Sequence, residues 1–506
     1  MALAGIDVGT GGCKITVFRE DGMELASAFR EYPFIAPRPG WLEIDPERIW
    51  QAVKDALKEV ASRSPELLEV MAVTSHGETL VAVDNEGFPV TNAIANFDVR
   101  AHSYTEYWRD RLNPLKIFEI TGMPLHGMYT VNKILWLRDN FPSVFERSRT
   151  FCCVEDFVIL RLTGEAVIDY SLAARTMLFD VRKREWSDTM LRLADLSSDN
   201  LSRVSPSGKV AGTLLSSVAQ EVGVKSGIPV ACGGHDQPSG LLGCGVQEPG
   251  EAMYGMGTSE CVAINLGTEP FLSKEMMENS FCCYPHVEEN AYLTLTYIAS
   301  GGSVLRWFRD EFGYEERMRA KAQGKDPYEL LLAEIPARPA STFVLPHFSG
   351  SGTPYLDERS RGALVGLTVG TGKTEVTRAI LESLTYEMKV NLDLFEEFGI
   401  PIRSLRVIGG GSRSPLWLQI KADILEKPLL TLSTGEAVAL GTAMLAGYAG
   451  GVFADLSQAR ESMVKSRDRI EPREKYHEAY EKRFQIYQKI YGALRDINRE
   501  ISALDT

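Results

Sequence analysis

The 506-residue sequence predicts an α/β protein built from two similar domains with a ligand-binding cleft between them. Predicted strands and helices alternate along the chain, which is typical of the α/β class. A Gly-Thr turn between two strands occurs at the start of the chain and again near its midpoint, which indicates a duplicated domain. The length also exceeds what one hydrophobic core supports. Clefts between domains are preferred ligand sites.

The overall composition excludes two classes of partner. Hydrophobic residues make up 44% of the chain and charged residues 24%, an ordinary globular balance. The net charge of -14 argues against a broad nucleic-acid or anionic-membrane surface. No apolar run approaches the roughly 18 residues of a membrane span, and the N-terminus lacks the basic region of a signal peptide. We therefore expect a soluble, cytoplasmic protein.

The eight cysteines predict reduced thiols. They include the adjacent pairs Cys152-Cys153 and Cys282-Cys283 and no CxxC motif. This pattern resembles neither a disulfide framework nor a zinc site, so we expect mostly buried, free cysteines. The histidines have no metal-ligand spacing, which excludes a typical zinc enzyme.

The first elements follow from local signals. Residues 2–7 and 14–18 are apolar strands around a glycine-rich turn, and Asp21-Gly22 predicts a hairpin to a third strand. A helix is expected to begin at Asp45-Pro46, with aspartate as N-cap and proline in the first turn. A strand over residues 70–74 follows.

Each Gly-Thr turn is a candidate phosphate site. The first reads Gly9-Thr10-Gly11-Gly12-Cys13, and the second reads Gly257-Thr258-Ser259-Glu260-Cys261. Glycines let backbone N–H groups approach phosphate oxygens, and the threonine hydroxyl adds a donor. Asp7 precedes the first turn, where it could hold Mg²⁺ through water, and Lys14 follows it, where it could offset phosphate charge. Taken singly, each turn is better explained as an ordinary hairpin that needs glycine for its geometry.

Asp236 is the candidate general base. A strand over residues 228–232 runs into Gly233-Gly234, then His235-Asp236-Gln237-Pro238, then a small-residue helix. Asp236 therefore lies at the carboxyl end of a strand and at a helix N-terminus, where α/β proteins bind ligands. The helix dipole favours the ionised carboxylate, the form a general base needs. The alternative interpretation is a plain N-cap aspartate.

Two further glycine-rich segments have different interpretations. Gly409-Gly410-Gly411-Ser412 follows a strand over residues 405–408 and precedes a helix from Ser414, where adenine or an α-phosphate could lie against the backbone. Residues 370–374 resemble the end of a P-loop, but Leu367 stands where that pattern requires glycine. We reject the P-loop. The aromatic stripe of Tyr476, Tyr480, Phe484, Tyr487 and Tyr491 has helical spacing and predicts packing.

These motifs, in this order, resemble the FGGY carbohydrate kinases of the sugar kinase, Hsp70 and actin ATPase superfamily. The phosphate motifs match residues 5–10 with Lys14, and residues 255–259. The adenosine motif matches residues 409–412. Residues 128–136 and 362–382 match the two family signatures, and residues 39–46 and 301–303 match further family segments. The resemblance covers essentially the whole chain.

The resemblance implies two RNase-H-like (actin-like ATPase) domains flanking a central cleft, with residues 1–246 binding sugar and residues 247–506 binding ATP. It implies an enzyme that uses ATP and Mg²⁺ to phosphorylate a small sugar or polyol, with Asp236 as catalytic base. Asp7 and Asp236 would serve the metal. The ATP-binding set would be Gly9, Thr10, Lys14, Gly257, Thr258, Gly409, Gly410, Gly411 and Ser412. Dimers are common in this family, so by analogy we consider a homodimer.

Departures from the family pattern leave the substrate open. Where glycerol kinases have an Arg-Glu pair, this chain has Gly77-Glu78, and the family's Trp-x-Asp-x-Arg begins here with Asn96. His-Asp-Gln at residues 235–237 is closer to the glycerol, fuculose and rhamnulose branches than to the xylulokinases. We expect a ketose such as a pentulose, or an alditol, bound by His76, Glu78, Asp98, Asp236 and Gln237. A carboxylate such as gluconate fits less well, because no arginine stands among the matched pocket positions.

Two non-kinase functions remain as alternatives. A nucleotide-binding module of the same superfamily would share the phosphate and adenosine glycines but would not need Asp236 in this setting. A catalytically silent sugar-binding regulator is the second alternative, and the presence of Asp7, Thr10, Asp236 and Thr258 together argues against it.

Overall fold

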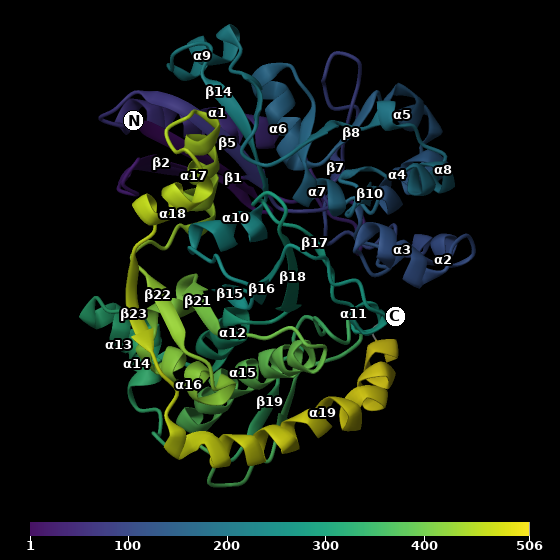
Figure 1. The fold of residues 1–506 in the computed structure, drawn as a ribbon. Helices are drawn as coiled ribbons and strands as arrows, with labels where there is room; N and C mark the ends of the chain where they lie inside the picture. Colours follow the sequence, from purple (N-terminus) through teal and green to yellow (C-terminus); the bar gives the residue numbers. More distant parts are fainter. Residues whose placement is uncertain (505–506) are drawn as a thin grey trace.

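Two α/β halves, each built on its own large sheet, make up the protein (Figure 1). The computed structural model describes residues 1–504. The first sheet has six strands in the order β13-β14-β5-β1-β2-β3. Their bounds are β1 Ala2–Gly9, β2 Gly12–Arg19, β3 Glu24–Glu31, β5 Leu68–Ser75, β13 Val210–Thr213 and β14 Pro229–His235. The meander expected at the N-terminus is confirmed, because β1, β2 and β3 pair antiparallel in sequence.

The second sheet has seven strands in the order β17-β18-β16-β15-β21-β22-β23. Their bounds are β15 Glu251–Met256, β16 Glu260–Gly267, β17 Tyr284–Pro285, β18 Tyr292–Ile298, β21 Ser404–Ile408, β22 Leu429–Leu432 and β23 Ser466–Ile470. In both sheets an antiparallel hairpin is followed by a strand parallel to its first member: β5 beside β1, and β21 beside β15. The two halves therefore repeat one strand order, as the duplicated Gly-Thr turns predict.

Local signals form the first helix as the sequence predicts. Helix α1 spans Pro46–Arg63, and the Asp45 side chain accepts the Glu47 N–H at 2.9 Å. Its apolar face, which includes Ile49, Val53 and Leu57, is buried in the core of the first half. A capped helix with a continuous apolar stripe packs onto a sheet in this way.

The remaining elements form smaller layers around the two sheets. The first half carries α2 Tyr104–Arg109, α3 Pro114–Thr121, α4 Thr130–Asn140, α5 Pro142–Arg147, α6 Val154–Thr163, α7 Tyr170–Ala174, α8 Asp188–Ala194, α9 Ser216–Val222 and α10 Asp236–Gly243, with short strands β4 Glu43–Ile44, β6 Val81–Val83, β7 Ala93–Ile94, β8 Thr150–Cys152, β9 Val167–Asp169, β10 Phe179–Asp180, β11 Glu185–Trp186 and β12 Arg203–Ser205. The second half carries α11 Lys274–Glu278, α12 Gly302–Phe312, α13 Tyr314–Gln323, α14 Pro327–Ala333, α15 Lys373–Glu397, α16 Pro415–Leu425, α17 Ala437–Ala449, α18 Leu456–Met463 and α19 His477–Leu504, with β19 Phe343–Leu345 and β20 Ala363–Val365. The aromatic stripe packs as expected, because Tyr480, Phe484 and Tyr487 on α19 are buried.

Helices α10 and α17 pack against each other between the two sheets. Helix α17 comes from late in the chain, yet it covers β1 and β5 of the first sheet, and it lies in the upper half of Figure 1 (yellow). Glycines allow this approach: a Cβ on Gly243 would lie 1.8 Å from the Ala437 carbonyl oxygen, and one on Gly441 would lie 1.9 Å from that of Ser239. Small residues at a helix contact let the two backbones come together.

The structure bears on two expectations from the sequence, which concern the cysteines and membrane-spanning helices. All eight cysteines are free thiols; Cys261 is half-buried and the other seven are buried. Within residues 1–504, no helix has both the length and the apolar character that a membrane crossing requires.

Candidate active site

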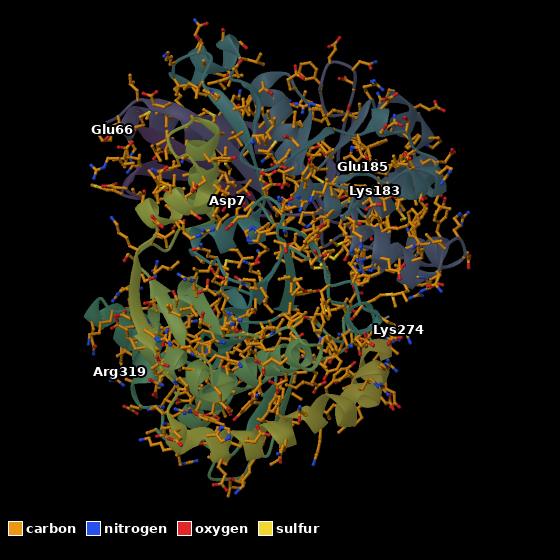
Figure 2. All side chains as sticks on the ribbon, viewed as in Figure 1. Asp7, Glu66, Lys183, Glu185, Lys274 and Arg319 are labelled. Carbon is orange, nitrogen blue, oxygen red and sulfur yellow. The ribbon has the colours of Figure 1, made fainter. Side chains whose placement is uncertain are left out.

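Three parallel strands of the first sheet end at the same place. Strand β5 lies between β1 and β14 and runs parallel to both, with Thr74 paired to Asp7 on one side and to Gly234 on the other. The Thr74 hydroxyl donates to the Gly234 carbonyl at 2.5 Å. Asp7 and Asp236 therefore meet at the carboxyl edge of the sheet, and Asp7 lies near the middle of the molecule, between the two halves (Figure 2).

The turn that presents Asp236 is held by buried polar groups. The Gly234 N–H donates to Glu155 Oε1 at 2.8 Å, and the His235 N–H donates to Ser171 Oγ at 2.9 Å. Gly234 has a φ of 91°, and a Cβ there would lie 2.8 Å from Asp169 Oδ2. Only glycine satisfies both conditions. The strand end is thus rigid where it becomes α10.

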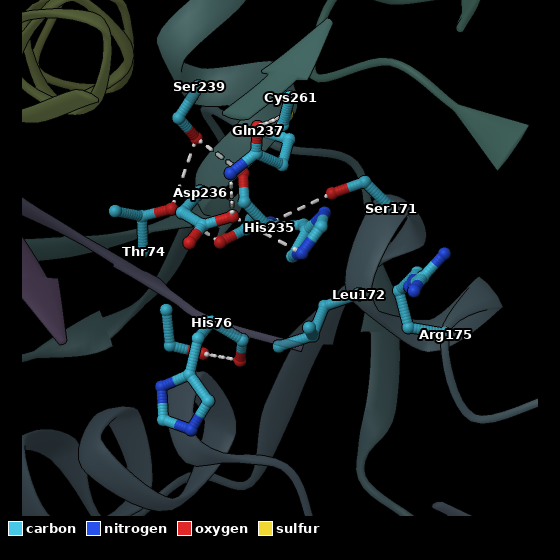
Figure 3. Close-up of polar contacts among 12 residues, drawn as sticks. Thr74, His76, Ser171, Leu172, Arg175, His235, Asp236, Gln237, Ser239 and Cys261 are labelled. Carbon is cyan, nitrogen blue, oxygen red and sulfur yellow. Dashed lines mark hydrogen bonds and ion pairs between the residues drawn. The ribbon is translucent and has the colours of Figure 1, made fainter. Parts of the chain in front are cut away.

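Asp236 is the first residue of α10, with His235 as the N-cap. Figure 3 shows Asp236, Gln237 and Ser239 of this helix beside Thr74 of β5. Gln237 Nε2 donates to Asp236 Oδ1 at 3.1 Å, and the Cys261 thiol donates to Gln237 Oε1 at 2.8 Å. Burial raises the pKa of Asp236 to about 6, and the Gln237 hydrogen bond opposes this rise. A carboxyl group with this pKa is ionised at neutral pH and still basic enough to accept a proton.

Asp7 lies in a crowded acidic environment. Burial, with the charges of Asp236 and Glu436, raises its pKa to about 7, and Lys14 opposes this rise. Two half-buried carboxylates that repel each other fit a divalent cation with hard oxygen ligands. Residues 1–504 contain no cluster of three or more acidic, histidine or cysteine ligands. A Mg²⁺ ion held here would therefore take its other ligands from phosphate oxygens and water.

The first Gly-Thr turn joins β1 to β2 beside Asp7. Gly9 and Gly12 are register partners, and the Tyr32 hydroxyl donates to the Gly9 carbonyl. Lys14 forms an ion pair with Glu436, 2.6 Å apart, just before α17. Sequence reasoning missed Glu436, because it is distant in the chain and carries no motif.

The second Gly-Thr turn packs against the N-terminus of α12. The Gly301 N–H donates to the Thr258 carbonyl at 2.9 Å, and the Gly302 N–H donates to the Gly257 carbonyl at 2.9 Å. Arg306 Nη2 donates to Thr258 Oγ1 at 3.5 Å. The family segment at residues 301–303 is therefore a structural support of this turn, and Arg306 adds a positive charge that the sequence analysis did not identify.

The third glycine cluster lies against the second turn. A Cβ on Gly409 would lie 2.7 Å from the Met256 carbonyl oxygen, and one on Gly411 would lie 2.8 Å from Met256 Cε. Met256 directly precedes Gly257, so the structure brings the two motifs together. Gly410 to Arg413 form a 3₁₀ turn, and α16 begins only at Pro415, with Ser414 as N-cap. The helix that the sequence places from Ser414 is therefore confirmed, and Gly409, Gly410, Gly411 and Ser412 precede it.

A buried network beneath the second turn also escaped sequence reasoning. Lys421 Nζ on α16 donates to the Tyr254 hydroxyl at 2.6 Å and to Glu260 Oε2 at 2.8 Å. Lys421 and Glu260 are fully buried. Glu260 follows Thr258 and Ser259, so this ion pair fixes the turn to α16.

Two of the side chains predicted to bind sugar already form hydrogen bonds within the protein. His76 is buried, and its two ring nitrogens contact the Val8 carbonyl at 2.9 Å and Thr79 Oγ1 at 2.8 Å. Asp98 is fully buried and accepts the Leu42 N–H at 2.6 Å and Arg100 Nη2 at 2.7 Å. Both therefore hold loops of the first half in place. A direct role for either in sugar binding stays a prediction.

Glu78 has an arginine partner that the sequence analysis did not identify. Arg175, at the C-terminal end of α7, donates its Nε to Glu78 Oε1 at 2.5 Å, and both side chains are buried. Glu78 has a φ of 64°, and Lys133 Nζ donates to its carbonyl at 2.6 Å. The matched positions contain no arginine, but the structure brings Arg175 to Glu78 from a helix distant in sequence.

An open cavity of the protein lies away from this site. It has a volume of about 240 Å³ and lies where the two halves and α18 meet, with Lys209, His286 and Tyr448 among its lining residues. Asp7 and Asp236 do not line it.

Comparison with known proteins explains this geometry. The N-terminal domain of the FGGY family of carbohydrate kinases matches residues 2–243, and the C-terminal domain of that family matches residues 252–450. The chain belongs to the FGGY family of carbohydrate kinases. It is thus a carbohydrate kinase, and the resemblance seen in the sequence is confirmed.

Individual relatives of this FGGY kinase differ in their substrates. The chain is 31% identical to a xylulose kinase of Escherichia coli (strain K12), over 97% of this chain and 98% of the relative. It is 33% identical to a glycerol kinase of Koribacter versatilis (strain Ellin345), over 92% of this chain and 93% of the relative. A gluconokinase of Bacillus subtilis (strain 168) is 28% identical, over 99% of this chain and 97% of the relative.

Solved structures share the fold of this FGGY kinase. A xyloylose kinase from Brucella ovis superposes with a TM-score of 0.87 at 26% identity, covering 98% of this chain and all 100% of the other. A gluconate kinase from Lactobacillus acidophilus superposes with a TM-score of 0.88 at 24% identity, covering 97% and 98% of the two chains. The two actin-like ATPase domains expected from the resemblance are therefore confirmed. As a family member the enzyme phosphorylates a sugar or polyol with ATP, and a metal ion is implied.

Proposed function

We propose that this kinase transfers the γ-phosphoryl group of ATP to a hydroxyl of a neutral small sugar or polyol, with Asp236 as the general base. The observation that carries the proposal is the position of Asp236. It lies at the carboxyl edge of three parallel strands beside Asp7, at the start of α10, with a pKa raised to about 6. Asp236 takes the proton from the attacking hydroxyl, whose oxygen bonds the γ-phosphorus as the bond to the ADP oxygen breaks.

The remaining groups position the phosphates. Gly9 and Thr10 on one side, and Gly257 and Thr258 on the other, would offer N–H and hydroxyl donors. Gly409 to Ser412, of which Gly409 and Gly411 pack against Met256 beside the second turn, would hold the nucleoside. Phosphoryl transfer depends mainly on such positioning and on charge stabilisation. Mg²⁺ held by Asp7 and Asp236 would neutralise phosphate charge when bound.

The charges around the site favour a neutral substrate. Asp7, Asp236 and Glu78 bring three carboxylates to the site, Arg175 is paired with Glu78, and Lys14 is paired with Glu436. A substrate carboxylate would add a further negative charge beside these three carboxylates, which is unfavourable. This argument replaces the sequence argument from a missing arginine, and it supports a ketose or an alditol over gluconate.

The test is ATP turnover by the purified protein with pentuloses, hexuloses, aldoses, tetritols, pentitols, glycerol and gluconate. We expect one group of neutral compounds to support turnover. Asp236→Asn should reduce kcat by at least about a hundredfold, which is the usual minimum effect of removing a general base. Asp188→Asn is the matched control, because Asp188 is also the first residue of a short helix but is exposed.

The same experiment separates the alternatives. Turnover without any sugar that survives Asp236→Asn would instead indicate a nucleotide-driven module. Sugar binding without turnover would indicate a silent regulator. The homodimer and the cytoplasmic location expected from the sequence stay predictions.

A further inference from the structure

Gly77 packs closely against both His235 and Arg175. A Cβ at this position would lie 3.2 Å from His235 Nε2 and 3.6 Å from Arg175 Nε. Gly77 is not among the residues with positive φ, so its backbone does not require glycine. His235 Nε2 in turn lies 3.2 Å from Asp236 Oδ1. Gly77 therefore lies against both Arg175 and the His235 ring that contacts the proposed catalytic carboxylate.

The Glu78–Arg175 ion pair is incompletely satisfied on the protein side. Arg175 Nε and Nη2 both contact the same oxygen, Glu78 Oε1. Arg175 Nη1 donates only to sulfur atoms, Met123 Sδ and Cys282 Sγ, each at 3.6 Å. Within residues 1–504, Glu78 Oε2 accepts no protein hydrogen bond. Sulfur is a weak acceptor, so the pair keeps one strong donor and one strong acceptor for another molecule.

Both halves of the protein surround this pair. The rings of Tyr129, from the first half, and Tyr284, from the second, each have a centroid 5.5 Å from the Arg175 guanidinium carbon. Cys282 also belongs to the second half. A ligand at the ion pair would therefore be enclosed by both halves, and the aromatic rings favour the cationic guanidinium over neutral replacements.

We propose that Arg175 determines substrate specificity in this kinase, and that Glu78 is the group that restricts it to neutral substrates. This inference rests on the proposed function. One substrate hydroxyl donates to Glu78 Oε2, and a neighbouring hydroxyl accepts from Arg175 Nη1, so the substrate carries two adjacent hydroxyls beyond the one that is phosphorylated. Glu78 occupies the guanidinium edge that a substrate carboxylate would otherwise take, and repels such a group.

A charge change at Glu78 makes this testable. Glu78→Gln keeps the shape of the side chain and frees the guanidinium of Arg175 for an acidic ligand. We expect the ratio of kcat/KM for an aldonate to that for the alditol of equal chain length to rise about tenfold or more, because a like-charge contact is removed. Gluconate with glucitol and xylonate with xylitol are the substrate pairs.

Variants of Arg175 provide the controls. Arg175→Lys keeps the charge but loses the planar fork, so KM for the neutral substrate should rise about tenfold with little change in kcat. Glu78→Gln/Arg175→Met removes both charges without leaving one buried alone, and it should abolish the gain toward the aldonate. Circular dichroism and thermal unfolding check that each variant is folded.

The outcomes separate the inference from the proposed function. If the wild-type enzyme phosphorylates no neutral compound, the proposed function fails. If it does, but a folded Glu78→Gln variant keeps the wild-type ratio and a folded Arg175→Lys variant keeps the wild-type KM, the specificity role of the pair is overturned. A higher ratio that persists in the double variant would also overturn the role of Arg175.

Discussion

At the scale of single residues, Asp236 combines burial with a charge that the reaction needs. Its carboxyl group lies beside Asp7, and its pKa of about 6 is well above the ordinary value of 3.8 for aspartate. The helix N-terminus and Gln237 favour the ionised form, whereas burial disfavours it more strongly. The result is a base that is half-protonated in mildly acidic solution.

This pKa predicts the pH dependence of activity. The general base acts only when deprotonated, so protonation of Asp236 should lower kcat/KM for the sugar about tenfold for each pH unit below about 6. Steady-state rates between pH 5 and 8, with saturating ATP and excess Mg²⁺, measure this. A profile that stays flat down to pH 5 would contradict the assignment of Asp236 as base.

Site residues that belong to short sequence motifs could be predicted from the sequence. Residues whose partners are distant along the chain could not. Gly9, Thr10 and Asp236 stand next to the turns and strand ends that place them, so short motifs identify them. Arg175 is 97 residues from Glu78, and Lys421 is 161 residues from Glu260. Neither follows a local motif, because folding alone brings each to its partner.

At the scale of elements, breaking the buried ion pair between α16 and the β15–β16 hairpin should lower the stability of the protein more than breaking a surface ion pair. Lys421→Met would leave the Glu260 charge alone in the core, which we expect to lower the free energy of unfolding by about 3–5 kcal/mol. The KM for ATP should also rise, because Glu260 supports the Thr258 turn. Chemical denaturation and ATP titration measure the two effects.

Lys427→Met is the matched control for Lys421→Met. Lys427 forms an exposed pair with Glu396, 2.5 Å apart, just beyond α16. Exposed pairs contribute about 1 kcal/mol or less. Equal effects of the two substitutions on unfolding would show that the Lys421–Glu260 pair has no special structural role.

The contact between α10 and α17 also predicts a steric effect. Gly243→Ala would place a methyl carbon 1.8 Å from the Ala437 carbonyl oxygen, so the helices must separate. We expect a loss of about 1–3 kcal/mol or more in the free energy of unfolding. Thermal unfolding measures it.

Gly492→Ala tests whether that loss comes from the contact itself. Gly492 is exposed within α19, and a Cβ there meets no atom within 4 Å. Alanine is the better helix former, so this variant should be more stable by up to about 1 kcal/mol. A Gly243→Ala variant as stable as the wild type would contradict the proposed close packing.

At the scale of the whole molecule, the two halves depend on each other. Leu3 and Ala72 of the first sheet share a core with Leu440 and Met444 of α17. A chain ending at residue 246 lacks this cover, so its apolar face would be exposed to water. Produced alone, residues 1–246 should aggregate.

Coexpression tests this dependence. Residues 1–246 and 247–506 expressed together should associate and recover sugar-dependent ATP turnover, because the second fragment supplies α17. A monomeric, cooperatively unfolding fragment of residues 1–246 would contradict the expectation. The fold class itself could be predicted from the alternating strands and helices. The packing of α17 against the first sheet could not be predicted, because nothing in its sequence indicates which sheet it covers.

The position of α17 also affects how the chain folds during synthesis. The last strand of the first sheet ends at His235, yet Ala437, where α17 begins, is synthesised only much later. At ordinary translation rates this delay lasts on the order of ten seconds or more. During that time the face formed by Leu3 and Ala72 has no native partner. The nascent first half is therefore the stage at which this protein most needs a chaperone, and slower translation would lengthen that exposure.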